Sequence, residues 1–251
     1  MHAKMIFNRV FSRVNPLAII CVFMFFSVGC NRDDHGDRHS HRSGTVSDID
    51  GNSYQTVIIG TQEWMTSNLR TTRYNDGASI EYPGTDNNAW ENNTRGAYSW
   101  YKNDEAAHSK TYGALYNWHA VNTGKLCPAG WRVPEDDEWT KVNKYLANNA
   151  GGKLKGNSPE YWSGMNTGAT NESGFNAFPS GVRFSNLPGG ARGESQGYFY
   201  YIGETGRWWT STDYSSSNAW YRSLHSNSGN VYRSHNFKGD GYSVRCVRNL
   251  D

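Results

Sequence analysis

The spacing of the cysteines constrains the fold of this chain more than any other feature of its sequence. Of four cysteines, only Cys127 and Cys246 lie beyond residue 30, and they are about 119 residues apart. Two cysteines left alone in an exported protein are expected to form one disulfide. Such a bridge would tie the middle of the domain to its last strand, and loop-entropy arguments give it roughly 4–5 kcal/mol. The alternative is a two-thiol metal or redox site.

The first 29 residues differ in composition from the rest of the chain. Lys4, Arg9 and Arg13 give a basic start, and residues 17–28 form an apolar run without a charge. This run has about 12 residues, whereas a membrane-spanning helix needs roughly 20. Residues 1–29 therefore indicate a signal peptide, and the remainder is expected to be exported into an oxidising space.

Cys30 directly follows the small residues Ser27, Val28 and Gly29, a sequence that resembles a lipobox. The resemblance implies that the signal peptide is removed before Cys30 and that the thiol of Cys30 receives a lipid anchor. Ordinary cleavage nearby, which would leave Cys30 as an odd thiol, is the alternative.

Residues 30–44 are expected to form a lipidated, disordered tether, because residues 31–44 contain no apolar side chain that could offset the entropy of ordering. The segment Arg32-Asp33-Asp34 is similar to the short charged signal that directs lipoproteins of Bacteroidetes-type bacteria to the cell surface. We therefore expect an outer-membrane location facing the cell surface. The three histidines of the tether favour a solvated linker over a metal site; they are His35, His39 and His41.

The charge of the chain excludes one class of partner. Residues 1–29 hold three of the 25 Lys and Arg and none of the 23 Asp and Glu, so the remainder has a net charge of −1. Nucleic-acid binding usually needs a concentrated basic surface. No nucleic acid is therefore expected as a partner.

Residues 45–251 are long enough for one domain with a substantial core, and their pattern predicts an α+β fold. A hairpin is expected from strands at 54–59 and 62–65, and a first helix at 112–121. A second helix should begin after Pro134, because acidic residues fill its first turn, and should end at 148–152. Its buried stripe is predicted to contain Trp139, Val142, Tyr145 and Leu146. Four strands are expected near the C-terminus, with turns at 226–229 and 238–241; these strands are 207–212, 219–224, 230–235 and 242–247.

Ordered motifs run along almost the whole domain. They are Asp48-Ile49-Asp50-Gly51-Asn52, Trp64-Met65, Asn68-Leu69, Gly113-Ala114-Leu115-Tyr116-Asn117-Trp118, Leu126-Cys127-Pro128-Ala129-Gly130-Trp131-Arg132-Val133-Pro134, Glu138-Trp139, Gly151-Gly152-Lys153-Leu154-Lys155, Thr170-Asn171-Glu172-Ser173-Gly174-Phe175 and Tyr242-Ser243-Val244-Arg245-Cys246-Val247. Together these motifs resemble the Fibrobacter succinogenes major paralogous domain family, which is found mainly in surface lipoproteins of Bacteroidetes and Fibrobacter. One departure is His119, where the family more often has an aromatic residue.

The resemblance implies a C-type-lectin-like fold, related to that of formylglycine-generating enzymes. Such a fold has two helices flanking small antiparallel sheets, and long loops between the second helix and the last strands. It also brings the two ends of the domain together, which suits a bridge between Cys127 and Cys246.

Abundant tryptophan and tyrosine indicate carbohydrate binding. Sugar rings have apolar faces that stack on aromatic rings, and hydroxylated edges that bind polar groups. The alternative is that these rings build the core, and this is what we expect for Trp118, Trp131, Trp139 and Trp209. The candidate ligand-binding residues are Tyr161, Trp162, Asn166, Arg183, Tyr198, Tyr200, Tyr201, Trp208 and Asp213.

No cofactor is expected. The Glu-Pro-Asn and Gln-Pro-Asp motifs that bind calcium and sugar in C-type lectins do not occur, and Asn171, Glu172 and Asp213 are scattered. Calcium is therefore not favoured. Metal-ligand spacing is also missing from the histidines of the domain, which are His108, His119, His225 and His235.

Catalysis is not expected either. A formylglycine-generating enzyme needs two copper-binding cysteines, and the pair here is assigned to a disulfide. Asp136, Asp137 and Glu138 are explained by the start of a helix, although carboxylates distant in sequence could still pair in space. The sequence thus predicts a lectin-like surface lipoprotein that binds glycans or glycoconjugates. The alternative is a structural or accessory subunit that docks to another envelope or adhesin component, and a hydrolase or formylglycine-type enzyme is least favoured.

Overall fold

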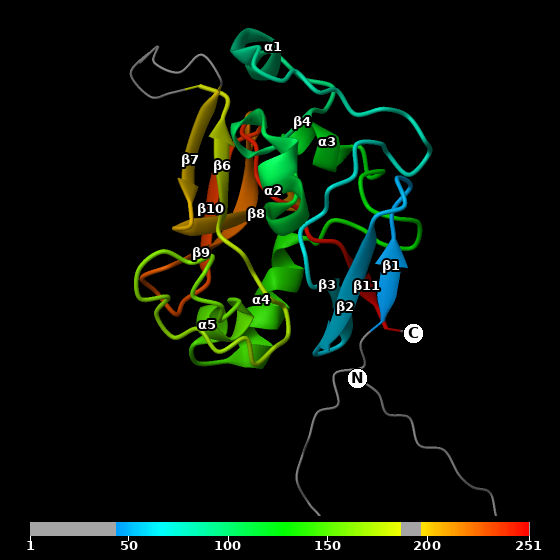
Figure 1. Ribbon diagram of the computed structural model, residues 1–251. Coiled ribbons are helices and arrows are strands. Elements are labelled where there is room, and N and C mark those ends of the chain that lie inside the picture. The colour runs from blue at the N-terminus through cyan, green and yellow to red at the C-terminus, as the bar shows by residue number, and fades with distance from the viewer. Residues whose placement is uncertain (1–43, 187–196, 251) are drawn as a thin grey trace, which may run out of the picture. The chain divides into compact units, whose positions relative to one another are not determined.

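The computed structural model of the 251-residue chain describes residues 44–186 and 197–250. It confirms an α+β domain, in which a four-stranded and a five-stranded sheet are joined by short helices and long loops (Figure 1). The predicted signal peptide, Cys30 and the tether to residue 43 lie outside the described residues. Within the described part, none of the helices combines the length and apolar character needed to cross a bilayer.

The four-stranded sheet contains both ends of the domain. Its order is β1 (Thr45–Ser47), β2 (Ser53–Ile59), β3 (Gln62–Met65) and β11 (Val247–Asn249). The predicted hairpin at 54–59 and 62–65 is confirmed, because β2 and β3 pair antiparallel around a turn in which Gly60 has a positive φ of 64°. The last strand, β11, pairs with β3, so the ends of the domain meet in one sheet.

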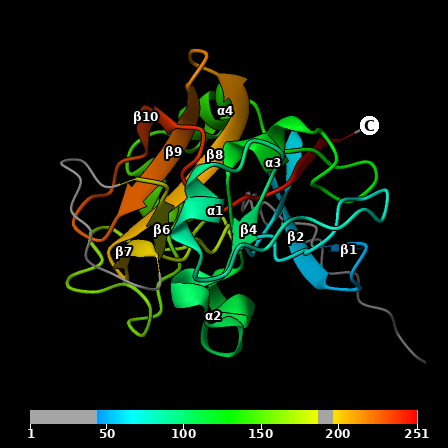
Figure 2. The ribbon, with the colours of Figure 1, turned by 90° about the horizontal axis from the view of Figure 1, so that it is seen from above.

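The five-stranded sheet has the order β10-β9-β8-β6-β7 (Figure 2). Strands β8 (Thr205–Asp213), β9 (Asn218–His225) and β10 (Tyr232–Phe237) form an antiparallel meander, which confirms three of the four predicted strands. Strands β6 (Ser180–Phe184) and β7 (Tyr198–Ile202) form an additional hairpin that the sequence analysis did not predict.

The predicted strand at 242–247 is wrong for all but its last residue. Tyr242 and Ser243 form isolated bridges to Tyr116 and Trp208, and a regular strand begins only at Val247. The β-rich composition of this segment reflects its burial instead, because Tyr242 through Val247 are all buried.

The second predicted helix is confirmed as α4 (Asp136–Leu146). Its start has a capping box, in which the Glu135 side chain accepts from the backbone of Glu138 and the Glu138 side chain accepts from the backbone of Glu135. Trp139, Val142 and Leu146 are buried as expected, whereas Tyr145 is 52 % exposed, so its assignment to the buried stripe is wrong. A short helix, α5 (Ala150–Leu154), follows.

The predicted helix at 112–121 is wrong over its first half. Residues 115–116 form a strand, β5 (Leu115–Tyr116), which pairs with β4 (Tyr98–Ser99), and only α3 (Trp118–Asn122) is helical. Asn117 separates them, because its Oδ1 accepts from the backbone of Ala120 as an N-cap. Strands β1 and β4 were not predicted, and neither were three helical elements before this segment: α1 (Asn87–Glu91), the 3₁₀ turn Tyr101–Asn103 and α2 (Glu105–Tyr112).

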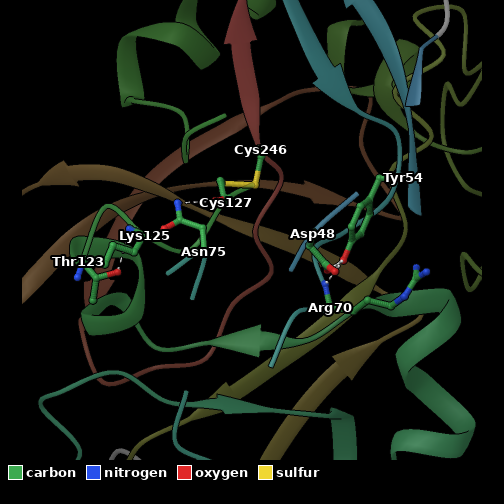
Figure 3. The surroundings of a disulfide bond; sticks show 8 residues. All are labelled: Asp48, Tyr54, Arg70, Asn75, Thr123, Lys125, Cys127 and Cys246. Carbon is green, nitrogen blue, oxygen red and sulfur yellow. Dashed lines mark hydrogen bonds between the residues drawn. A yellow bond between two sulfur atoms is a disulfide. The ribbon is translucent and has the colours of Figure 1, made fainter. Parts of the chain in front are cut away.

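The predicted disulfide is confirmed. Cys127 and Cys246 are bridged with their Cα atoms 5.9 Å apart, and the Asn75 side chain donates to the Cys127 carbonyl at 3.0 Å (Figure 3). The bridged sulfur atoms leave no thiolate for a two-thiol metal site. The bridge joins the loop after α3 to the residue directly before β11.

Strand β8 separates two aromatic cores. Trp208 faces α4, where its ring centre lies 6.0 Å from that of Trp139. Trp209 faces the opposite side and stacks on Tyr242 with ring centres 4.3 Å apart. The assignment of four tryptophans to the core is confirmed for Trp118, Trp131, Trp139 and Trp209.

Candidate functional site

A pocket of about 510 Å³ opens on the Trp209 side of the five-stranded sheet. Strands β7 and β10, which are the opposite edges of this sheet, both contribute to it. The sheet is therefore curled, so that its two edges approach each other across β8. We call this site the aromatic pocket, and its lining residues are Phe184, Ser185, Asn186, Tyr200, Tyr201, Asn236, Phe237 and Asp240.

Aromatic rings form one part of the pocket wall. Tyr201 and Phe237 are 43 % and 44 % exposed, so each presents a ring face or edge to solvent. The Tyr201 ring lies 6.4 Å from Phe184 and 6.0 Å from Tyr200, centre to centre. Tyr201 also has a positive φ of 65°, which is strained for an aromatic residue and is typical of positions held in place for function.

The polar end of the pocket is built around Asp240, which is 3 % exposed. Its Oδ1 accepts from the backbone and side chain of Ser185 at 2.9 and 3.0 Å, and its Oδ2 accepts from Asn236 Nδ2 at 2.8 Å. Burial raises the pKa of the Asp240 carboxyl to about 6, although the hydrogen bonds from Ser185 act in the opposite direction.

Arg207 of β8 lies beneath the aromatic wall. Its guanidinium is within 5.8 Å of the ring centres of Phe184, Tyr201, Tyr221 and Tyr242, and Nη1 donates to the Tyr242 hydroxyl at 3.1 Å. The arginine thus holds the rings in place through cation–π contacts. Its positive charge also opposes the rise in the pKa of Asp240 that burial causes.

The structure brings two of the sequence-predicted ligand residues, Tyr200 and Tyr201, into this pocket. Tyr198 is on the same strand, half-buried and paired with Phe184, but does not line the pocket. The remaining exposed candidates are elsewhere. Tyr161 packs edge-on against Phe178, Asn166 donates to the Gly156 carbonyl, and Asp213 forms an ion pair with Lys238.

Three predicted ligand contacts are wrong, because the side chains are buried in the core. Trp162 and Trp208 are 2 % and 0 % exposed, and their indole nitrogens donate to Ala177 O and Asn68 Oδ1. Arg183 is 0 % exposed, with its guanidinium 4.2 Å from the Trp90 ring centre. Aromatic and cationic residues in a chain poor in leucine serve as core material, and composition alone does not separate these from surface rings.

Six lining residues of the pocket were missed by the sequence analysis. A signal was present for two of them, because Phe237 directly precedes the predicted turn at 238–241 and Asp240 lies within it, and loops frequently carry binding residues. The remaining four gave no pattern that distinguishes them; they are Phe184, Ser185, Asn186 and Asn236.

Metal ligands do not gather in the part of the chain that the structure describes. No group of three or more His, Cys, Asp or Glu side chains there has a geometry that could hold an ion. Asn171 has a positive φ of 53° and its Oδ1 accepts from the Asn176 backbone, so this residue forms a hydrogen-bonded turn. The histidines of the tether, His35, His39 and His41, lie outside the described residues.

Comparisons with known proteins identify a family but no characterised relative. No curated protein and no solved structure matches the chain significantly. The family model described as the Fibrobacter succinogenes major domain matches residues 57–248, which is more than half of the chain and includes every lining residue of the aromatic pocket. The chain therefore belongs to the Fibrobacter succinogenes major domain family.

Proposed function

We propose that this protein is a lipid-anchored envelope protein whose domain binds a glycan or glycoconjugate in the aromatic pocket, without catalysis. The observation that carries the proposal is the presence of two half-exposed rings, Tyr201 and Phe237, in one pocket with Asn236 and Asp240. Sugars need both elements, because the face of a pyranose ring is apolar and its edge carries hydroxyl groups. A volume of about 510 Å³ is within the range of small-molecule sites.

A C-type-lectin-like arrangement of the domain is part of this proposal. Two features support it: the pairing of the last strand, β11, with the N-terminal hairpin, and the disulfide that joins residue 127 to residue 246. The long irregular segment between α5 and β6 is also in keeping with it. Fold alone does not assign a ligand, so the glycan proposal rests on the pocket.

A glycan array tests the proposal. We expect saturable binding by the full-length protein, and a loss of about tenfold or more in Tyr201→Ala, because an exposed anchoring ring commonly contributes 1–2 kcal/mol. The matched control is Tyr214→Ala, which removes a tyrosine of similar exposure (48 %) outside the pocket. An array without binding, or equal binding by both variants, would contradict the proposal.

The lipid anchor and its location are tested separately. Metabolic labelling with a radioactive fatty acid should mark the wild-type protein and not Cys30→Ser. Antibody binding to intact cells should detect the wild-type protein if the anchor lies in the outer leaflet of the outer membrane. Labelling of both proteins, or detection only after the cells are broken, would contradict the respective part of the proposal.

A second candidate function is docking to another envelope or adhesin component. It is favoured by an aromatic cluster outside the pocket, in which Tyr214 stacks on His235 at 3.6 Å and Arg233 lies 3.4 Å from the ring centre of Trp220. Exposed rings of this kind are enriched in protein interfaces. A partner that co-purifies after gentle solubilisation, and is lost in Tyr214→Ala but retained in Tyr201→Ala, would select this function.

A further inference from the structure

The amide of Asn236 is held in one orientation by its neighbours. Its Nδ2 donates one hydrogen bond to Asp240 Oδ2 at 2.8 Å and another to the Tyr242 hydroxyl at 2.7 Å. An amide nitrogen has two hydrogens, so both are used. Among the residues that the structure describes, none donates to Asn236 Oδ1. The part of this side chain left for a ligand is therefore a hydrogen-bond acceptor.

Asp240 orients the side-chain amide of Asn236, and all hydrogen-bond acceptor positions of its own carboxylate are occupied. Its two oxygens accept from Ser185 N, Ser185 Oγ, Asn236 Nδ2 and, at 3.4 Å, the Tyr242 hydroxyl. A carboxylate has about four acceptor positions, and each is taken by a protein donor. Asp240 thus acts on a ligand through Asn236 and not by direct contact.

The charges around the pocket balance. Asp240 is the only Asp, Glu, Lys or Arg among the described lining residues, and Arg207 lies beneath the rings that cover it. Opposite charges on these two groups leave the described part of the pocket without a net charge. An ionised sugar would lose its hydration there without gaining a cationic partner, which is unfavourable.

We propose that Asn236 is the specificity-determining residue of the aromatic pocket, and that the ligand is an uncharged pyranose that donates a hydroxyl hydrogen to Asn236 Oδ1. This inference rests on the proposed glycan-binding function and narrows it to neutral sugars. The ring face of the sugar lies against Tyr201 and Phe237, and the hydroxylated edge points to Asn236.

The test compares sugars that differ in one group, a neutral hydroxymethyl or a carboxylate at C6. Each neutral pyranose on an array is paired with the uronic acid made from it by oxidation at C6, and affinities of the full-length protein are measured for both. We expect the neutral member to bind about tenfold or more tightly, because the carboxylate of the acidic member would be desolvated in the pocket without a cationic partner. Equal or tighter binding of the acidic member overturns the inference.

Variants of Asn236 and Asp240 test the role of the Asn236 side chain. Asn236→Leu removes the acceptor and should weaken binding of the neutral sugar about tenfold. Asn218→Leu, a half-buried asparagine outside the pocket, is the control and should bind like wild type. The single exchange Asn236→Asp places two carboxylates together and should also weaken binding. The double exchange Asn236→Asp with Asp240→Asn restores a donor–acceptor pair, and binding should return.

The outcomes separate the two proposals. If no sugar binds and Tyr201→Ala behaves like wild type, the glycan-binding function fails and this inference fails with it. If sugars bind through Tyr201 but Asn236→Leu binds like wild type, or the double exchange does not recover binding although its circular dichroism is native, only the assignment of Asn236 fails.

Discussion

Buried cations are a recurrent feature of this domain at the scale of single residues. Lys155, Arg183 and Arg245 are each 0 % exposed, and within the described residues none of the three forms an ion pair. Carbonyl oxygens and ring faces surround them instead; Arg245 lies 4.1 Å from the Phe175 ring centre and donates to Asn176 O. Burial lowers their pKa values, to about 8 for Lys155, about 10 for Arg183 and about 9 for Arg245.

Lys155 is expected to hold two segments together, the loop after α5 and the turn between β9 and β10. Its Nζ donates to the carbonyls of Thr167, His225 and Ser228 at 2.8–3.1 Å. Lys155→Met would leave these acceptors without a donor, so we expect a loss of about 3 kcal/mol in the free energy of unfolding. Urea titration measures this loss. The exposed Lys141→Met should change stability by less than about 0.5 kcal/mol, and a similar value for Lys155→Met would contradict the role.

Asp240 is expected to make stability depend on pH. Its folded pKa of about 6 lies above the ordinary value of 3.8, so the folded state binds the proton more tightly than the unfolded state. Stability should therefore fall as pH rises from about 4 to 6, by an amount on the order of 2–3 kcal/mol, and this contribution should be constant above pH 6.

The measurement for this prediction is the difference between wild type and Asp240→Asn in urea titrations at several pH values. Taking the difference removes the contribution of His108, His119 and His225, whose pKa values are lowered by burial and which act in the opposite direction near pH 6.5. A difference that does not vary between pH 4 and 6 would show that Asp240 titrates normally.

At the scale of secondary-structure elements, Asn117 decides how the segment 112–122 folds. Its Oδ1 accepts from Ala120 N at 3.1 Å and from Ala97 N at 2.9 Å, so one side chain starts α3 and also anchors the residue directly before β4. Asn117→Ala removes both contacts in a fully buried position. We expect a loss of about 2–3 kcal/mol in the free energy of unfolding.

Chemical denaturation of matched variants checks this expectation. Asn122→Ala, an exposed asparagine at the other end of α3, should change stability by less than about 0.5 kcal/mol. If the two variants are equally stable, capping by Asn117 does not determine the break between β5 and α3.

Elements with local sequence signals could be predicted, whereas strands defined by distant partners could not. Strand β3 and helix α4 carry local signals, a turn at Gly60 and a capping box at Glu135, and both were predicted close to their observed bounds. Residues 112–121 have helical spacing of apolar residues, but the partner of β5 is β4, more than ten residues away, and local spacing does not report such pairing. Strand β6 was missed for the same reason, because its partners β7 and β8 both lie more than ten residues away along the chain.

The candidate site was less predictable than the fold. Tyr200 and Tyr201 could be named because aromatic residues in a loop-rich region suggest a sugar site. Asn236 could not, because its role comes from the curling of the sheet, which brings β10 opposite β7. Trp162 and Trp208 were assigned to the site from composition, whereas tight packing around α4 and β8 decides their position.

At the scale of the whole molecule, the disulfide connects the loop after α3 to the strand that completes the four-stranded sheet. Removing it with Cys127→Ser and Cys246→Ser should lower the free energy of unfolding by about 2–4 kcal/mol. Thermal unfolding with and without reductant measures the effect. Because the bridge is not among the lining residues of the aromatic pocket, the variant should bind ligand like wild type below its melting temperature. A variant as stable as wild type would show that strand pairing alone holds β11.

The pairing of β11 with β3 makes this domain suitable for insertion into other proteins and for tandem repetition. Strands β1 and β11 are the two outer strands of one four-stranded sheet, so the strand spacing and the register put the points where the chain enters and leaves the domain at roughly 20 Å from each other. A unit with such close junctions can be spliced into a loop of a host protein, or repeated in tandem, without pulling its strands apart. The aromatic pocket lies on the five-stranded sheet, so such an insertion would leave its geometry unchanged.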